Sequence, residues 1–294
     1  MTTTLSIKES NQIFLDYLSK DKPFFIGRLS DEITNMSLNY MVHGVVNQRL
    51  KHISKTNAGI YYKDDTKDDD AIIYCKFYIS SLKNITALAS FPSLYVNSQN
   101  FTIKKFNLKK HQIFHNRVLE PFYLLNENKD EIIWTHRLKD KKVLIISPFV
   151  DTFKSQIEKG FNFYGKDDER RIWNKDQQFV FYKAYVSLAH NKPHKNWFET
   201  YLTMCQDIKQ LDFDIALLSC GGYGMLLCDF IFSKMNKSSI YIGGGLQLLF
   251  GVYGNRWLNH NIISGLIREN SDWCRPSNEE KPKNCETVEG GCYW

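Results

Sequence analysis

The chain has 294 residues, of which 43% are hydrophobic and 24% are charged, and its formal net charge is +6. A chain of this length and composition buries a sizeable core, which excludes the class of disordered proteins. The positive charge is mild and its lysines are dispersed, so we expect no nucleic-acid partner and interpret the densest group, Lys104, Lys105, Lys109 and Lys110, as a solvated face.

Long hydrophobic runs and cysteine motifs are both missing from the sequence pattern. No stretch approaches the roughly 20 apolar residues of a membrane span, and residues 1–11 lack the apolar core of a signal peptide. We therefore expect no transmembrane segment and a cytoplasmic location, which for a viral protein is the host cytoplasm. The seven cysteines form no Cys-x-x-Cys pair and are odd in number, so we expect reduced thiols.

The first predicted unit is a strand followed by a helix. Residues 23–28 are apolar and aromatic and end in Gly-Arg, which indicates a buried strand. Asp31 stands where an N-cap belongs, and apolar residues then recur at helical spacing to about Leu50. The acidic run 64–70 is expected to be an exposed loop before a second helix. We place the buried side of that helix at Ile72, Ile73, Phe77 and Leu82.

The middle of the chain gives one clear strand. Residues 91–118 contain aromatic and β-branched residues that indicate one or two further strands. Glu120 precedes a proline, which favours an extended backbone at that position. Residues 143–146 form a short apolar run typical of a buried strand, and Asp151 or Thr152 can cap the helix that follows.

The last third of the chain has the most regular pattern. Residues 178–185 alternate as in a strand, and residues 197–211 carry apolar side chains at helical spacing. The apolar run 215–218 predicts a strand covered on both faces, and a glycine turn, a helix over 225–235 and a strand at 240–242 follow. This order predicts an α/β fold, with a Rossmann-like, mostly parallel sheet flanked by helices.

We expect one domain with two appendages. Residues 1–16 are an N-terminal extension, residues 17–265 form the Rossmann-like domain, and residues 266–294 form a C-terminal tail. The tail ends in Tyr293-Trp294, and such an aromatic pair indicates a tail docked on the domain.

Two glycine-rich turns follow the last two predicted strands: Gly221-Gly222-Tyr223-Gly224 and Gly243-Gly244-Gly245. A turn without Cβ atoms lets the backbone approach an anion, and free amides at the start of the next helix point toward negative charge. The turns therefore fit a phosphate or diphosphate. The alternative is that the glycines only permit tight turns, and Leu227 occupies the place of the third glycine of the dinucleotide fingerprint.

Ligands of such a sheet bind at the carboxyl ends of its strands. In the predicted order this edge carries Arg28, Asp31 and Asp151 together with the two glycine turns and Gln247. Arg256 follows the second turn closely, which favours the same edge.

Several motifs together resemble a known family. Arg28-Leu29-Ser30-Asp31-Glu32 follows a Phe-rich strand, Glu120 stands before Pro121, and VLIISPF, FDIALLSCGGYG and YIGGGLQLLFGVYGNRW follow in order. Over about residues 20–294, including the terminal GGCYW, the chain resembles proteins encoded with bacterial surface-polysaccharide genes and in some large viruses. Those proteins are similar, more distantly, to the GT-D class of glycosyltransferases.

This resemblance implies an enzyme that uses a nucleotide-diphosphate sugar donor and a glycan or other hydroxyl acceptor. In GT-D enzymes the first motif is Arg-x-Gly-Asp-x-Glu, whose acids are thought to hold a divalent metal against the donor diphosphate. Arg28 and Asp31 match, Ser30 replaces the glycine, Ile33 occupies the final acid position, and Glu32 stands one place early. Asp31 and Glu32 are thus the implied ligands of Mn²⁺ or Mg²⁺.

The remaining roles follow from what glycosyl transfer requires. Arg28 and Arg256 are candidates to bind the diphosphate, because a planar guanidinium matches it bidentately. Gln247 is a candidate for a sugar hydroxyl or a base edge. A general base for the acceptor hydroxyl is also needed, and Asp151 and Glu120 join Asp31 as the catalytic candidates.

Other interpretations of these residues stay open. Asp31 can be an N-cap, Glu32 an ordinary first-turn acid and Arg28 the ion-pair partner of one of them. At the level of the protein, a non-catalytic nucleotide- or sugar-phosphate-binding module would account for Ile33. A different transferase or a phosphate-ester enzyme on the same α/β architecture is a further alternative.

Overall fold

The computed structural model describes residues 5–90, 96–108 and 112–294. Seven strands form one sheet in the order β3-β2-β1-β7-β6-β4-β5, and every pairing in it is parallel. The fold is therefore the predicted α/β, Rossmann-like sheet flanked by helices. The strands are β1 (Phe25–Arg28), β2 (Ala87–Ala89), β3 (Gln112–Phe114), β4 (Lys142–Ser147), β5 (Gln178–Lys183), β6 (Ile215–Leu218) and β7 (Ser238–Tyr241).

The central strands are buried on both faces, which is why they read as continuous apolar runs. In β4, Val143 and Ile145 belong to the core on one face of the sheet, and Leu144 and Ile146 belong to the core on the other. β5 lies at the edge of the sheet, and its residues are half-buried or exposed. Its alternating sequence reflects this half-buried position.

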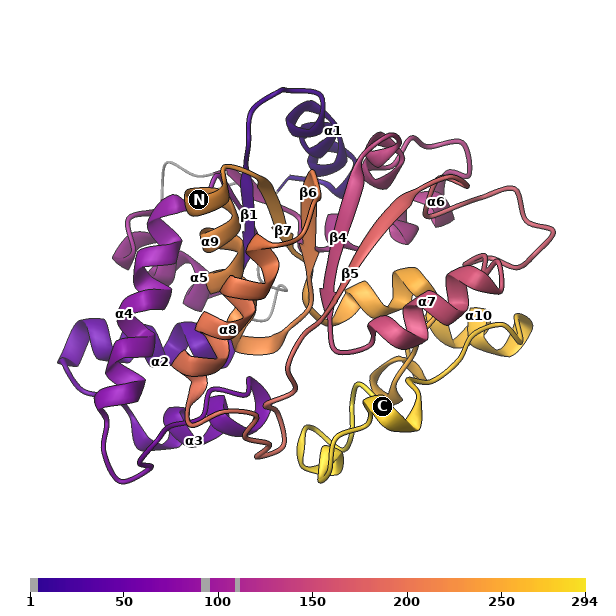
Figure 1. Cartoon of the computed structure of the whole chain (residues 1–294). Coiled ribbons are helices and arrows are strands. Elements are labelled where there is room, and N and C mark those ends of the chain that lie inside the picture. The colour runs from indigo at the N-terminus through magenta and orange to yellow at the C-terminus, as the bar shows by residue number, and fades with distance from the viewer. Residues whose placement is uncertain (1–4, 91–95, 109–111) are drawn as a thin grey trace.

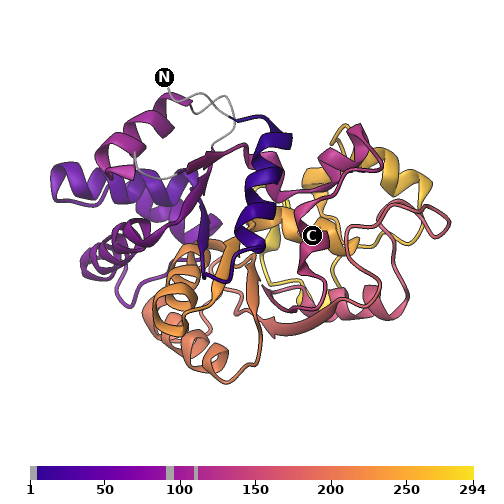
Figure 2. The same cartoon turned by 90° about the horizontal axis from the view of Figure 1, so that it is seen from above.

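Helices cover both faces of the sheet (Figure 1). One face is covered by α2 (Asp31–His43), α3 (Gln48–Asn57), α4 (Asp69–Asn84), α5 (Val96–Lys105), α8 (Trp197–Lys209) and α9 (Gly224–Met235). The other is covered by α1 (Ile7–Leu18), α6 (Phe122–Glu127), α7 (Val150–Glu158), α10 (Ile263–Glu269) and the 3-10 helix η6 (Gly243–Phe250). From above, the orange helices α8 and α9 and the yellow C-terminal segment lie on opposite sides of the sheet (Figure 2).

Both appendages pack on the domain. Phe14 of α1 is fully buried, with its ring centroid 4.7 Å from that of Phe114 and 5.8 Å from that of Trp134. Trp294 is 5% exposed, and its ring centroid lies 5.9 Å from that of Phe149, just before α7. The C-terminal tail is thus docked, as its aromatic residues indicate.

The helix expected to run to about Leu50 is wrong, because the chain forms two helices there. α2 ends at His43, and Gly44 adopts a left-handed conformation with φ of 71° that closes the helix. α3 starts after Asn47, whose side chain accepts a hydrogen bond from the amide of Leu50. A left-handed glycine is a common helix terminator, so the break has a local cause.

The buried side of α4 is also partly different from the expectation. Ile73 and Phe77 are 40% and 37% exposed, whereas Tyr74, Cys75 and Tyr78 are buried. The tyrosine hydroxyls find partners inside the protein, since that of Tyr74 donates to a backbone carbonyl and that of Tyr78 bonds a threonine. The interface of α4 is therefore formed by tyrosines with satisfied hydroxyls, and Ile73 and Phe77 lie at its edge.

Residues 91–118 were expected to hold one or two strands. The structure has the helix α5 and the strand β3 in this region, and β2 lies before it. Residues 91–95 and 109–111, including Lys109 and Lys110, lie outside the described residues. Among the described helices, none has the length and apolar character that a membrane crossing requires. All seven cysteines are free thiols, as expected.

Two helix caps differ from the sequence-based expectations. Ser30, and not Asp31, is the N-cap of α2, because the Ser30 hydroxyl accepts from the amide of Ile33 at 3.4 Å. The amide of Asp151, at the start of α7, donates to Glu280 Oε1 at 2.8 Å. Glu280 also bonds the amide of Thr152, so the C-terminal tail caps this helix in place of a local side chain.

Candidate functional site

A cleft forms at the carboxyl edge of the sheet because the chain leaves neighbouring strands toward opposite faces. After β1 and β6 it continues into α2 and α9 on one face, and after β7 and β4 it continues into η6 and α7 on the other. The loops that follow β1, β7, β6 and β4 therefore diverge. Such a divergence is the place where open α/β sheets bind ligands.

The cleft has two connected lobes, which share Asn57, Ala58, Gly221, Tyr241, Gly243, Gly244 and Tyr293. The polar lobe encloses about 920 Å³, partly open to solvent, and is further lined by Arg28, Leu29, Ser30, Glu32, Ser90, Arg256 and Glu289. The apolar lobe is further lined by Pro148, Phe149, Tyr185, Val186, Ser187, Leu188, Ser219 and Cys220. Pockets of this size and mixed lining are typical of small-molecule sites.

Arg28 and the second glycine turn meet in the polar lobe. Nη1 of Arg28 donates to the carbonyl oxygen of Ile242 at 3.2 Å. Gly243, the next residue, has a φ of 75°, and a Cβ atom there would clash with the same Nη1. The glycine thus provides both the backbone conformation and the space that bring this guanidinium to the cleft.

Arg256 reaches the polar lobe from the other side, where the C-terminal tail holds it. Its guanidinium carbon lies 4.7 Å from the ring centroid of Tyr293, and its Nη2 forms a salt bridge with Glu289. Cation–π and ionic contacts together fix the group. The structure therefore brings Arg28 and Arg256 into one lobe.

The acid motif after β1 lies at the start of α2. Glu32 lines the polar lobe, and its Oε2 is 3.5 Å from the hydroxyl of Ser30. Ile33 is 1% exposed and packs in the core, so a carboxylate at that position would be buried among apolar residues. Asp31 is the first residue of α2, and the structure describes its backbone but not its side chain.

Glu120 lies beside the second glycine turn. Its carboxylate occupies the space where a Cβ atom on Gly245 would be. Burial raises the pKa of the Glu120 carboxyl above its ordinary value, and the positive charges of Arg28, Arg117 and Arg256 act in the opposite direction. This carboxyl therefore lies behind the second glycine turn, and Glu120 does not belong to the lining of either lobe.

The first glycine turn differs from the expectation of a phosphate cradle. The amide of Gly222 donates to the carbonyl oxygen of Ala58 at 2.8 Å, and the amides of Tyr223 and Gly224 donate to Cys220 and Gly221. Gly221 lines the cleft, but the other three residues of the turn are buried behind it. These three amides already have protein partners, so the tight-turn alternative describes this segment better.

The glycines of the first turn are required by packing. A Cβ atom on Gly224 would overlap the ring of Tyr241, and one on Gly222 would lie 2.5 Å from Cδ1 of Ile60. Tyr223 is 1% exposed and belongs to the core. The turn thus serves close contact between β7, α9 and the segment after α3.

Two other candidates lie away from the lining of the cleft. Gln247 is 1% exposed and donates its Nε2 to the carbonyl oxygen of Tyr293 at 3.2 Å, so it holds the tail, while its Oε1 has no hydrogen-bond partner among the described residues. Asp151 forms salt bridges with Lys183 at 2.6 Å and Lys154 at 3.8 Å. The hydrogen bond from Lys183 holds the pKa of Asp151 below its ordinary value, which makes this carboxylate a poor general base.

Several residues of the cleft were missed by the sequence-based reasoning, among them Asn57, Glu289 and Tyr293. Asn57 ends α3, and the other two come from the tail. The aromatic pair at the terminus was a signal for docking, but nothing in the sequence indicated where the tail would dock. No local pattern marked Asn57.

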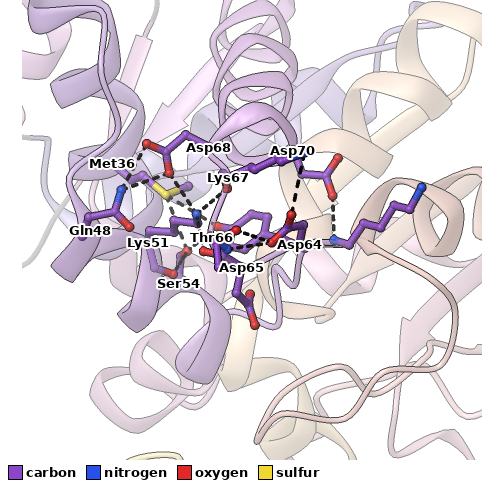
Figure 3. A network of polar contacts seen from close by, with 12 residues as sticks. Met36, Gln48, Lys51, Ser54, Asp64, Asp65, Thr66, Lys67, Asp68 and Asp70 are labelled. Atoms are coloured by element: carbon purple, nitrogen blue, oxygen red, sulfur yellow. Dashed lines mark hydrogen bonds and ion pairs between the residues drawn. The ribbon is translucent and has the colours of Figure 1, made fainter.

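The wall that carries Asn57 is held by a buried ammonium group (Figure 3). Lys51, on α3, is 4% exposed, and its Nζ donates to the carbonyl oxygens of Asp65 and Lys67 at 3.0 and 2.5 Å. It also forms a salt bridge of 2.9 Å with Asp68. The acidic loop before α4 is therefore wrapped around a cation that belongs to the chain itself.

The donor set of the polar lobe bears on the implied metal. In the part of the chain that the structure describes, no three His, Cys, Asp or Glu side chains form a group that could hold an ion. Mg²⁺ and Mn²⁺ often use only one or two protein carboxylates together with substrate phosphates. Glu32, with Asp31 beside it in the chain, fits that smaller donor set.

Comparisons of this chain with protein-family models, with curated proteins and with solved structures each found no match.

Proposed function

We propose that the protein is a glycosyltransferase that uses a nucleotide-diphosphate sugar in glycan or surface-polysaccharide assembly. The single observation that supports this most is the placement of Arg28 and Arg256 around one polar lobe at the carboxyl edge of the sheet. Two guanidinium groups that converge on one space match a diphosphate, which each can bind bidentately. The resemblance to GT-D enzymes, through Arg28 and the acids after it, agrees with the same location.

Cleavage of the donor develops negative charge on the leaving diphosphate, and this charge must be stabilised. Arg28 and Arg256 supply positive charge directly. Gly243 and Gly244 stand at the first positions of η6, where helix amides have no partner within the helix. A divalent metal, which Asp31 and Glu32 would hold, supplies further charge neutralisation when bound.

The apolar lobe fits the nucleoside part of the donor. Phe149, Tyr185 and Tyr293 place aromatic rings around it, and Leu188 adds an aliphatic wall. A planar base gains from stacking on such rings, whereas the charged diphosphate remains in the polar lobe. The two connected lobes thus correspond to the two chemical halves of the proposed donor.

Glu120 is the general base of the proposed reaction. Its carboxyl is beside Gly245 and within the electrostatic influence of Arg28 and Arg256. A raised pKa lies closer to neutral pH, and a general base that takes a proton from a hydroxyl works best when its pKa is near the working pH. Asp151 is excluded from this role by its two lysine partners.

One observation favours a second function, a nucleotide-binding module without catalysis. Ile33 is buried in the core where the GT-D motif has its final acid, so the chain lacks that carboxylate at the cleft. Such a module would keep Arg28 and Arg256 for the diphosphate. It would bind nucleoside diphosphates and leave every sugar donor intact.

The test is isothermal titration of UDP and GDP, with and without Mn²⁺, into the protein and into Arg28→Ala and Glu32→Gln. We expect Arg28→Ala to weaken binding at least about tenfold, the usual size of a lost charge-assisted hydrogen bond. Glu32→Gln is expected to reduce the gain from Mn²⁺. Arg268→Ala, on the exposed surface of α10, is the matched control and should bind as the unchanged protein does.

A second measurement separates the enzyme from the module. Hydrolysis of a panel of nucleotide sugars without acceptor, lost in Glu120→Gln while binding remains, supports the enzyme. Binding without turnover of any donor supports the module. If neither diphosphate binds, or if Arg28→Ala binds equally well, both functions are contradicted.

A further inference from the structure

A second groove lies at the opposite edge of the sheet from the cleft. The segment 159–177 connects α7 to the start of β5, and it frames a hollow of about 850 Å³ that is partly open to solvent. The hollow continues into a shallower one, and the two share Arg171, Trp173, Asn174 and Lys175. Nothing in the proposed transfer reaction uses this groove.

Aromatic rings form one wall of the groove. Phe161, Trp173 and Phe179 are all half-buried there. The indole N–H of Trp173 donates to the carbonyl oxygen of Leu249 at 2.8 Å, and the Trp173 ring meets that of Phe179 edge-on, with centroids 5.1 Å apart. The wall is therefore rigid and offers apolar ring faces to a ligand.

The charged side chains that line the groove are all basic. Arg171 and Lys175 line both parts, and Arg137 lines the shallower part. The same segment also contains Asp167, Asp168, Glu169 and Asp176, but no described carboxylate belongs to the lining, and Asp168 is paired with Arg170. Among the described residues, Arg137, Arg171 and Lys175 form no salt bridge. The groove is thus electrostatically complementary to an anion.

Asn162 adds an unsatisfied acceptor. This residue is 4% exposed and lines the deeper part of the groove. Its Nδ2 donates to the carbonyl oxygens of Gly165 and Asp168, but its Oδ1 has no hydrogen-bond partner among the described residues. A buried amide oxygen without a partner is costly, and it requires an N–H or O–H donor.

From these three features we infer that the groove binds an acidic saccharide, a sugar ring that carries a carboxylate or a phosphate. The apolar face of a sugar ring packs on an aromatic wall, its hydroxyl groups donate to Asn162 Oδ1, and its anionic group pairs with Arg137, Arg171 or Lys175. A simple anion such as inorganic phosphate satisfies only the charges. A neutral saccharide satisfies only the aromatic wall and the amide.

This site is independent of the proposed donor cleft. The two are nevertheless connected by η6, which begins at Gly243 in the cleft and ends next to Leu249 in the groove. An acidic glycan bound in this groove would stay close to the protein without occupying the cleft at the carboxyl edge of the sheet. Binding of a saccharide in this groove does not depend on any transfer activity of the cleft.

The test is titration of four probes monitored by calorimetry: a galacturonic-acid trimer, glucose 6-phosphate, maltotriose and inorganic phosphate. The protein is compared with Arg137→Gln/Lys175→Gln, whose side chains are exposed, so the fold should be unaffected. The matched control is Lys20→Gln/Lys234→Gln, which removes two exposed charges elsewhere. We expect the acidic saccharides to bind, the double variant to weaken them at least about tenfold, and the control to leave them unchanged.

The probes also identify the source of the anionic group. Preference for the trimer indicates a uronate-containing glycan, and preference for glucose 6-phosphate indicates a sugar phosphate. Binding of phosphate alone as tightly as of either saccharide overturns the inference, and so does equal binding of maltotriose or no binding of any probe. UDP titrated into the same double variant should bind unchanged, which separates a failure here from a failure of the proposed donor site.

Discussion

The two glycine turns look alike in the sequence but differ in what they do. In the first, the amide of Gly222 is bonded to Ala58, those of Tyr223 and Gly224 are bonded within the turn to Cys220 and Gly221, and missing Cβ atoms make room for buried side chains. In the second, Gly243 and Gly244 face the cleft beside Arg28 and Tyr293. Glycine in a strand–helix turn therefore indicates close approach, and the approaching group decides whether the turn serves packing or binding.

The largest expected effect is that of Gly224→Ala. The new methyl group would overlap the buried ring of Tyr241, and overpacking of this kind costs about 3 kcal/mol. We expect the free energy of unfolding, measured with a denaturant, to fall by roughly that amount. Gly265→Ala, on α10 with open space around it, is the control and should change stability by less than about 1 kcal/mol. Equal effects of the two variants would contradict a packing role for the first turn.

Gly243→Ala is expected to act on ligand binding as well as on stability. The methyl group would push Nη1 of Arg28, the mobile end of a long side chain, away from the cleft. We expect about tenfold weaker binding of UDP by calorimetry, with a backbone cost of about 1 to 2 kcal/mol in stability. Gly44→Ala is the control for backbone strain. Gly44 has a similar φ of 71°, but a Cβ atom there would have no neighbour within 4 Å. A loss of affinity in both variants would show that backbone strain, and not the displacement of Arg28, weakens binding.

Tyr241→Phe tests the connection between the turns. Tyr241 stands two residues before the start of the second turn, and its hydroxyl donates to the carbonyl oxygen of Gly221 in the first at 2.9 Å. Its removal is expected to cost about 1 kcal/mol in thermal or denaturant unfolding. Tyr17→Phe, which changes a tyrosine on α1 far from both turns, is the control. No loss of stability in Tyr241→Phe would mean that the turns are held independently.

The smallest effect is expected for Glu120→Gln and appears as a pH dependence. The folded protein raises the pKa of Glu120, so it favours the protonated form, and its contribution to stability is complete below the ordinary pKa and is lost as pH rises through the raised value. Glutamine imitates the protonated carboxyl at every pH. The variant should therefore gain stability relative to the unchanged protein as pH rises from about 4, the ordinary range of a glutamate. The opposite slope would show that the arginines, and not burial, dominate at Glu120.

Much of the fold was predictable because its strongest signals are local. The apolar runs of β4, β6 and β7 arise because both faces of these strands are buried. The helical periodicity of α9 arises because one face of the helix packs on the sheet. The left-handed conformation of Gly44 is also local, but the sequence does not indicate whether a glycine within a helical pattern continues the helix or ends it. The buried side of α4 required knowledge of the partners that satisfy the hydroxyls of Tyr74 and Tyr78.

The site was less predictable because its contacts are distant in the chain. Arg28 and Arg256 were placed by the strand order alone, and the structure brings both to the polar lobe. Asp151 stood at the end of a strand as expected, yet Lys183 of the neighbouring strand takes its carboxylate. Glu280, which bonds the first amides of α7, lies 129 residues from Asp151, and no window of sequence relates the two.

The ammonium of Lys51 has a consequence for experiments with metal chelators. An acidic loop of this composition resembles one that would collect a dissolved cation, but its positive charge is covalently attached and cannot be sequestered. EDTA should therefore leave the melting temperature of this part of the protein unaltered. A loss of UDP affinity that EDTA produces would then point to the proposed ion at Asp31 and Glu32 and not to this loop.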